Sequence, residues 1–518
     1  MTQPDPTALP LRLARQMLAI IERDRPRLAR VDDYLHGRHD DPYMPPTADA
    51  EYRLLAGRAV TNMSPILVGT PAQALAVDNY RRGSDDDSEG DSGGRTVSPE
   101  WRHWQESRLD ARQSAVHRAA LAYGHSFTLT EKTAKGIRTK GLSPLRTTAL
   151  YEDAANDDAP YAALTIVRHP DPSEDRPGRA RMWDGVNEYA VTFKAPTDED
   201  SIRVSAGAKH GATECPVTRF AAAVDLEGRT VGVVEPLIPL QNRINQTVFD
   251  LLVAQTYGSF VVRTATGMSP PMKTKPVWEM GQEPYSQGAE GWTDAQGRKV
   301  DSTGRILVNG EPMLLEVVPV IDPQTGKPIP EQIDVNARRF LFAADEKAKW
   351  GSLEATPLGG YIESVDMSIR HLSAIGQVPP HHLLGQIANL SAEALQAAET
   401  SLSRKVAEFR NVFGESWERV FRLAAQLAGD TELAENYMGE VIWRDMEMRS
   451  LSQAADGLGK LAEQLHIPRK GLWPRVPDVT RQELTEWDRL YDEEDVDRQM
   501  VDALHRSSAG SVSDSPAE

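Results

Sequence analysis

The chain has 518 residues, of which 40% are hydrophobic and 26% charged, and its formal net charge is −18. This length exceeds what one hydrophobic core supports, so we expect two to four structural units. The acidic balance excludes broad binding to nucleic-acid phosphates, because Lys and Arg drive that binding. The single cysteine, Cys215, excludes an internal disulfide framework and fits a reducing cytoplasm.

Neither a signal peptide nor a membrane span is predicted. Arginines interrupt the apolar residues of the N-terminus early, which is not the pattern of a signal peptide. The most apolar window, residues 249–262, contains Asp250, Gln255 and Thr256. It falls short of the run of about 18 apolar residues that a spanning helix needs.

The first region of the chain is predicted to begin with a helix. Apolar residues recur at helical spacing over residues 8–35, and Pro42, Pro45 and Pro46 then break the pattern. The acidic run of Ser and Gly at 84–94 is expected to be a solvated loop.

A second helix is predicted to begin at Ser98 as its N-cap, with Pro99 in the first helical position. Its apolar stripe runs from Trp101 to Tyr123, and we expect Gly124 to end it. The tryptophans of this stripe are expected to pack in a core rather than to stack on bases. Four short strands follow, which makes this half α+β: 127–132, 161–168, 179–184 and 188–194.

Two further helices flank an irregular insertion. The first begins at Pro239 and ends at Gly258, and the second covers residues 361–376. Between them, residues 259–357 are rich in Gly and Pro, which predicts hairpins and loops. This insertion holds only short strand candidates: 260–263, 305–308 and 313–320.

Residues 391–428 predict one very long helix. Apolar residues from Leu395 to Leu427 follow each other by alternating steps of three and four, which keeps one apolar stripe. Ser391 is a suitable N-cap, and the helix would be roughly 57 Å long at 1.5 Å per residue. Gly414 costs roughly 1 kcal/mol against alanine in a helix interior, so we predict a kink there. The alternative is a straight helix that packs closely at this glycine.

The C-terminal part returns to shorter helices, near residues 449–466 and 480–505. Acidic residues outnumber basic ones toward the C-terminus, and the last dozen residues are expected to be disordered.

No motif for catalysis or cofactor binding is found in the sequence. Phosphate-binding GxxxxGK[ST], nucleophile-elbow, GxGxxG, CxxC and HExxH patterns are all absent. The charged segment at 36–41 is more typical of a solvated turn than of a zinc site. For His381 and His382 we expect a loop role, because adjacent side chains rarely face the same way. No catalytic residue, metal or cofactor is predicted, and a mechanical or scaffold protein is favoured over an enzyme.

Several separated stretches resemble the portal proteins of tailed bacteriophages, in the subgroup common to long-tailed siphoviruses. The resemblance covers most of residues 30–500 and rests on the order and spacing of the stretches. It departs from the family at Gly69-Thr70-Pro71 and in the acidic run at 84–94. The stretches are Tyr34 to Gly37, Asn62 with Tyr80 to Gly83, Trp104 to Phe127, Ile238 to Asn245, Pro379 to Gly385, Asn389 to Leu395 and Phe413 to Glu418.

The resemblance implies a ring, usually of twelve subunits, at one vertex of a capsid. Double-stranded DNA is pumped through such a ring by a separate ATPase and leaves through it on infection. The implied partners are further copies of the chain, the terminase large subunit, head-tail adaptors, the major capsid and scaffolding proteins and the passing DNA, with no membrane. The implied location is the portal vertex of the virion, after assembly in the host cytoplasm.

The fold that the resemblance implies is an α+β, portal-type multidomain subunit with an α/β wing, a helical stem, a β- and loop-rich clip, a long wing helix and a helical crown. Carried over onto this chain, the parts are the wing at 1–235, stem helices at 236–258 and 358–378, the clip at 259–357, the tunnel loop at 379–390, the long wing helix at 391–428, the crown at 429–505 and a disordered tail at 506–518.

Two sets of channel residues follow from the resemblance. On the second stem helix, Glu363, Asp366 and Arg370 lie off the apolar stripe and are expected to face the lumen. A mostly acidic lumen repels phosphate, so DNA would slide without sticking. The tunnel-loop residues in light contact with DNA would be His381, His382, Gly385, Gln386 and Asn389.

Two other classes of protein stay open at this point. A metal-dependent hydrolase or nuclease would use scattered Asp, Glu and His side chains, but the sequence offers no spaced set of ligands for it. A different ring-forming scaffold, such as a head-tail adaptor, would be much shorter and would not need two stem helices with an insertion.

Overall fold

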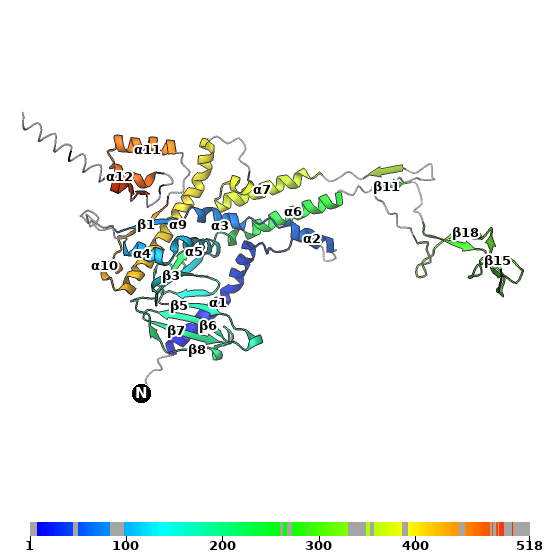
Figure 1. Ribbon diagram of the computed structural model, residues 1–518, viewed down its shortest axis with the longest axis horizontal. Helices are drawn as coiled ribbons and strands as arrows, with labels where there is room; N and C mark the ends of the chain where they lie inside the picture. Colours follow the sequence, from blue (N-terminus) through cyan, green and yellow to red (C-terminus); the bar gives the residue numbers. More distant parts are fainter. Residues whose placement is uncertain are drawn as a thin grey trace, which may run out of the picture. The chain divides into compact units, whose positions relative to one another are not determined.

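The computed structural model divides into two compact units, residues Met1–Leu252 with Gly359–Glu518 and residues Val253–Leu358 (Figure 1). The second unit covers nearly the same residues as the expected insertion at 259–357. The acidic run at 84–94 and most of the region after 476 lie outside the described residues. The structure describes 8–44, 50–82, 98–258, 263–266, 272–289, 291–329, 349–352, 357–385, 392–444, 451–476 and a few residues between 479 and 500.

Helix α1, Ala8–Leu35, has the predicted bounds and serves two cores. Its first half places Leu13 and Met17 against the inner face of a six-stranded sheet. Its second half places Leu28 and Val31 in the main core of the unit. Two shorter helices follow it: α2, Ala50–Ala59, and α3, Ser64–Gln73.

The helix predicted from Ser98 to Tyr123 is in fact two helices, α4, Pro99–Glu106, and α5, Leu109–Tyr123. Ser98 is the N-cap as predicted, and Gly124 ends α5 at a φ of 92°. Arg108 breaks the run at a φ of 55°. In one continuous helix, residues 104 and 109 would point about 140° apart. The break lets Trp104 and Leu109 enter the same core, and Trp104 Nε1 donates to Asp110 Oδ1 at 2.8 Å.

Antiparallel strands form two sheets of three or more strands in the first unit, beside the two-stranded pair of β1, Val77–Arg81, and β20, Glu440–Trp443 (Figure 1). One has the order β10-β2-β3, and the other follows the path β4-β5-β6-β7-β8 with β9 paired to β7. The four predicted strands are confirmed as β2, β5, β6 and β7, while the others are not predicted from the sequence. The bounds are β2 His125–Thr133, β3 Gly136–Leu142, β4 Thr147–Leu150, β5 Ala162–Arg168, β6 Gly178–Asp184, β7 Asn187–Phe193, β8 Arg203–Val204, β9 Ala208–Lys209 and β10 Val217–Ala221.

The long helix α9, Ala392–Ala428, confirms the predicted strut. Its 37 residues correspond to roughly 55 Å at 1.5 Å per residue. The buried side chains follow the expected stripe, from Leu402 through Phe409 and Phe413 to Leu427. Around this stripe, α1, α3, α4 and α5 form the main core with the paired strands β1, Val77–Arg81, and β20, Glu440–Trp443. The expected N-cap Ser391 lies outside the described residues.

Aromatic rings join α4 to α9. The rings of Trp104 and Trp417 meet edge to face at 5.0 Å, and Trp101 stacks on Trp104 at 5.6 Å. Such pairs contribute roughly 0.5–1.5 kcal/mol each beyond the area that they bury. The packing role expected for these tryptophans is therefore confirmed.

His117 lies inside this core as a neutral imidazole. Its Nδ1–H donates to the carbonyl oxygen of Leu75 at 3.1 Å, and its Nε2 accepts from Trp417 Nε1 at 2.9 Å. Burial lowers the pKa of His117 to about 4. Burial also lowers the pKa values of His103 and His125 to about 4.

Arg419 connects α9 to the strand β10. Its guanidinium is buried and donates to the carbonyl oxygens of Val217 at 2.7 Å and Cys215 at 3.0 Å. A carboxylate oxygen of Glu214 lies 3.4 Å away. A buried cation is tolerated only when its donors are paired in this way, so these contacts fix which face of α9 meets the sheet.

The second unit is built of short antiparallel pairs and turns. The predicted strands at 305–308 and 313–320 are confirmed in part as β16 and β18, and most of 260–263 lies outside the described residues. The carboxylate of Asp294 is fully buried and accepts from the backbone amides of Gln282, Gln296 and Arg298 at 2.8–3.1 Å. The pairs are β11 Arg263–Thr266 with β19 Lys349–Ser352, β12 Thr274–Trp278 with β18 Leu314–Pro319, β13 Ser286–Gly288 with β14 Gly291–Thr293 and β15 Lys299–Val300, and β16 Leu307–Val308 with β17 Glu311–Pro312.

The fold is a mixed α+β arrangement with long helices and several small antiparallel sheets, as predicted (Figure 1). The predicted helix near 449–466 is confirmed as α11, Leu451–Gln464. Two short helices flank it in the sequence, α10, Thr431–Ala434, and α12, Arg469–Leu472. In the parts of the chain that the structure describes, no helix is both long and apolar enough to cross a membrane.

The lowered pKa values of His103, His117 and the half-buried His125 predict a loss of stability in acid. Their pKa is about 4 in the folded chain against 6.5 when exposed, so the unfolded state takes up protons first as pH falls. Stability that is present above pH 6.5 is lost toward pH 4. Between pH 7 and pH 5, the free energy of unfolding should fall by roughly 2 kcal/mol per histidine. Denaturant unfolding at the two pH values measures this.

His103→Gln serves as the control, because it removes one of the three titrating groups. The difference in unfolding free energy between pH 7 and pH 5 should then shrink by about a third. An unfolding free energy that is the same at both pH values would contradict the neutral state of these rings.

Gly414 offers a second test. The residue is helical and buried, and a Cβ built on it would meet Trp443 Nε1 at 3.8 Å and Glu418 Oε1 at 3.9 Å, which is ordinary contact rather than close packing. Gly414→Ala should therefore raise the free energy of unfolding by roughly 1 kcal/mol, because alanine is the better helix former. The kink predicted at this position stays a prediction.

Gly232→Ala is the matched control for that substitution. Its Cβ would overlap the carbonyl oxygen of Ala122, so this variant should be strongly destabilised. Loss of stability in Gly414→Ala would show that the helix needs a glycine there.

Candidate functional site

The helix α6, Ile238–Gly258, is anchored by buried amide side chains. Gln241 accepts from the backbone amide of Met63 at 3.0 Å and donates to the carbonyl oxygen of Thr61 at 2.7 Å. Asn245 accepts from the amide of Thr61 at 3.1 Å and from Gln241 Nε2 at 3.0 Å. Both side chains are 2% exposed or less. Buried amides are costly unless paired, so these bonds fix α6 against the segment between α2 and α3.

A second set of bonds extends this anchor to the end of α1. Tyr34 donates to Asn242 Oδ1 at 2.5 Å, and Asn242 Nδ2 donates to Asp40 at 3.1 Å. Asn245 Nδ2 donates to His39 Nδ1 at 2.8 Å, and the His39 ring stacks on Tyr34 at 4.5 Å. Three of the stretches that carry the resemblance (34–37, Asn62 and 238–245) therefore meet at one place in the fold.

Helix α7, Gly359–Gly376, packs on α6 through an apolar cluster. Ile244 of α6 lies in this cluster with Ile369 and Leu372 of α7. At the side of the pair, Arg243 Nη2 donates to Nδ1 of His371 at 3.0 Å. The expected pair of helices is thus held by both apolar packing and a side-chain hydrogen bond.

The expected channel residues of α7 lie on one exposed face. Glu363, Asp366 and Arg370 are spaced by three and four residues, so they share one stripe of the helix. All three are exposed in the single chain, on the side away from Ile369 and Leu372. The stripe carries two negative charges and one positive charge.

Part of the segment 379–390 is helical rather than a loop. Pro380–Leu384 form the short helix α8, and Gly385 ends it at a φ of 65°. Gln386 and Asn389 lie outside the described residues. The two remaining residues expected there, His381 and His382, are on α8.

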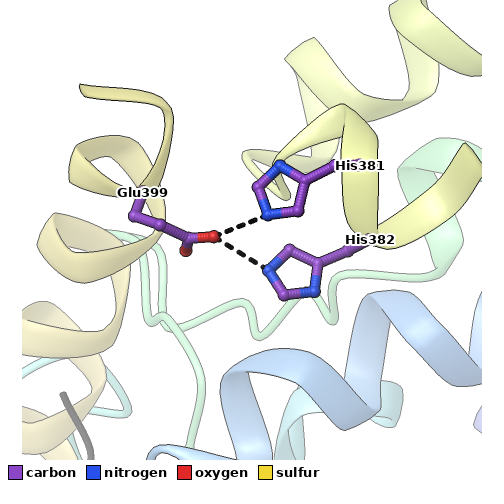
Figure 2. A group of neighbouring side chains, drawn as sticks. All are labelled: His381, His382 and Glu399. Atoms are coloured by element: carbon purple, nitrogen blue, oxygen red, sulfur yellow. Dashed lines mark hydrogen bonds and ion pairs between the residues drawn. The ribbon is translucent and has the colours of Figure 1, made fainter. Parts of the chain in front are cut away.

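The two histidines face the same carboxylate (Figure 2). His381 Nε2 lies 2.9 Å from Glu399 Oε1 of α9, and His382 Nε2 lies 3.0 Å from the same oxygen. Their ring centroids are 4.4 Å apart. The expectation that adjacent side chains point apart is wrong here, because both rings turn toward the neighbouring helix and reach one acceptor.

A separate polar cleft of about 420 Å³ lies between the end of α7 and α9, and neither the two histidines nor Glu399 lines it. Lys405 of α9 donates from Nζ to the carbonyl oxygen of Gly376 at 2.7 Å. A cation at a helix C-terminus is favourable, and burial lowers the pKa of this lysine. The cleft is lined by Gln377, Ala397, Thr400, Ser401, Arg404, Lys405 and Glu408.

Sequence reasoning does not find Glu399, Arg243 or His371. Glu399 is separated from the histidines by an intervening segment and a helix start, so no fixed spacing marks it. Arg243 and His371 lie on helices that are far apart in the sequence. The helical period of the sequence places each of these residues at the edge of an apolar stripe. It does not show which residue of another helix each one contacts.

The described residues thus form a 37-residue helix, a packed helix pair and a separate unit of short strands. The chain belongs to the phage portal protein family of the SPP1 Gp6-like type, whose family model matches residues 15–497. The resemblance seen in the sequence is therefore confirmed. Members of this family are structural proteins rather than enzymes, so the hydrolase or nuclease alternative is set aside.

Two relatives from mycobacteriophages are both portal proteins. The portal protein of Mycobacterium phage D29 is 30% identical over 178 residues, 32% of this chain and 35% of that protein. The portal protein of Mycobacterium phage L5 is 21% identical over 408 residues, 76% of this chain and 71% of that protein. The chain thus matches about a third of the length of the D29 protein and more than two thirds of the L5 protein.

Proposed function

We propose that copies of this chain form a ring, twelve in the usual form of the family, at one vertex of a phage capsid. Double-stranded DNA would enter the capsid through the ring, driven by the terminase large subunit, and leave through it on infection. The ring would be assembled in the host cytoplasm with the major capsid and scaffolding proteins and would later bind head-tail adaptors. The match to the portal family over residues 15–497 carries this proposal.

The parts of the subunit are proposed by the same reasoning. Residues 1–235 would be the wing, α6 and α7 the stem, and 259–357 the clip that meets the packaging motor and the adaptors. Residues 379–390 would be the tunnel loop, α9 the long wing helix and 429–505 the crown. The separation of residues Val253–Leu358 as a compact unit supports a distinct clip.

In the proposed ring, exposed apolar residues of α7 would be available for contact with a second copy of the chain. Ile362, Met367 and Ile375 are 50–61% exposed, although they lie on a helix whose other side is packed on α6. Their spacing of five and eight residues places them on different sides of α7, so they are separate apolar contact points rather than one patch. In a closed ring, each copy would cover part of this surface on its neighbour.

The charged stripe of α7 supports passage of DNA without retention. With the helix pair packed side to side around a ring, Glu363, Asp366 and Arg370 would face the hole. Two carboxylates and one guanidinium per subunit give an acidic lining, which repels phosphate. Basic residues in the same place would bind phosphate through the release of counterions and would slow the DNA.

Reversal of these charges tests the proposed lining. Rings of Glu363→Lys/Asp366→Lys should bind duplex DNA in a salt-sensitive way that wild-type rings do not show, because each subunit gains two phosphate-binding cations. Affinity for duplex DNA at 50 mM and 200 mM salt measures this, and phage that carry the variant should package DNA more slowly.

The matched control is Asp200→Lys/Glu227→Lys, which changes the net charge equally at two exposed positions of the proposed wing. Its rings should retain wild-type behaviour in both assays. Equal DNA binding by the two double variants would show that α7 does not line the passage.

A further inference from the structure

Three side chains of types that can ligate a metal converge where α8 meets α9 (Figure 2). The group is His381, His382 and Glu399, whose ligand atoms all lie within 4.8 Å of one another. The two imidazoles come from one short helix and the carboxylate comes from another. The side chain of His381 is 10% exposed, while those of His382 and Glu399 are about a third exposed. The group is therefore supported on one side and open to solvent on the other.

The distances in this group are close to those of a metal site. Zinc binds imidazole nitrogen and carboxylate oxygen at about 2.0–2.2 Å, so tetrahedral ligand atoms lie roughly 3.3–3.6 Å from one another. The two Nε2 atoms lie 2.9 Å and 3.0 Å from Glu399 Oε1. Outward movements of a few tenths of an ångström would admit an ion between the three atoms.

Hydrogen bonding alone gives a simpler account of the same contacts. Each imidazole would donate its Nε2–H to the shared carboxylate oxygen, and no ion would be needed. The two accounts differ in the protonation of Nε2. In the hydrogen-bonded account each Nε2 carries a hydrogen, whereas in the metal-bound account each Nε2 is unprotonated and its lone pair faces the ion. Measured metal binding separates them.

We propose that His381 Nε2, His382 Nε2 and the carboxylate of Glu399 bind one divalent transition-metal ion of the zinc class. Two imidazoles with one carboxylate select zinc and its neighbours over magnesium and calcium, which prefer oxygen ligands. Three protein ligands leave the fourth position of a tetrahedral ion to water on the open side. This site goes beyond the proposed portal function and does not depend on it.

The ion would join two elements that flank the segment 386–391. His381 and His382 precede this segment and Glu399 follows it, so a bound ion would hold its two ends at a fixed separation. Lys405, six residues beyond Glu399, also ties α9 to the end of α7. The ion would add a second connection, between α8 and α9.

Metal titration of the full chain tests the site. After removal of metal with a chelator, cobalt(II) should give visible absorption bands of a four-coordinate site that saturate at one ion per chain, and zinc should displace them. Zinc should also raise the midpoint of thermal unfolding. His381→Ala, His382→Ala and Glu399→Gln should each weaken cobalt binding by at least about tenfold.

Two variants control for the chemistry and the helix. His371→Ala removes a histidine of α7 outside the group, and Glu408→Gln changes an exposed carboxylate on α9 itself. Both should bind cobalt as the wild type does. The exposed side chain of His382 makes its alanine variant the one least prone to misfold, and its circular dichroism should match that of the wild type.

Two results would overturn the proposal. One is the absence of saturable cobalt or zinc binding, and the other is binding that is unchanged in His382→Ala and Glu399→Gln. In either case the hydrogen-bonded account stands. Since the titration needs no ring, its failure leaves the proposed portal function unaffected, and failure to form rings leaves the metal site testable.

Discussion

The buried hydrogen bonds of Gln241 and Asn245 are the constraint on which the helix pair depends. These two amides connect α6 to the backbone at residues 61–63. Both are buried, so water could not replace their hydrogen bonds if these were broken. A buried donor or acceptor left unpaired costs roughly 1–3 kcal/mol, so α6 has one favourable register against residues 61–63. Because α7 packs on α6, the position of its exposed stripe follows from the same bonds.

Helix α9 supplies the other constraint. Its apolar stripe forms the main core, and Arg419 and Trp417 add buried polar bonds to β10 and to His117. Apolar packing alone would tolerate some rotation of a long helix, whereas paired polar atoms do not. A strut that is held at a fixed rotation keeps its N-terminal half, with Glu399 and Lys405, in a defined place beside α7 and α8.

Helical periodicity and capping residues predict much of the helical structure from the sequence. The period of α9, the N-cap at Ser98 and the glycine after Tyr123 depend on neighbouring residues, and the structure has them where expected. The break at Arg108 depends on where Trp104 must pack, which is a tertiary requirement. Strand β3 holds two glycines among polar residues, and β10 has only five residues. Both take their stability from β2 between them, so their own residues carry little signal.

The candidate site was less predictable for a related reason. The stripe of Glu363, Asp366 and Arg370 follows from helical spacing on one element. The meeting of His381 and His382 with Glu399, and of Tyr34 with Asn242, depends on how separate elements pack. A single sequence identifies such residues as candidates but does not show which of them contact each other. The family resemblance identifies the stretches of sequence but not their contacts.

The most direct measurement is an electron cryo-microscopy reconstruction of the purified full-length chain. The account predicts closed rings with a central hole and with the Glu363 face of α7 turned toward it. Particles without a hole, or rings in which that face is buried between subunits while another element lines the passage, would contradict it.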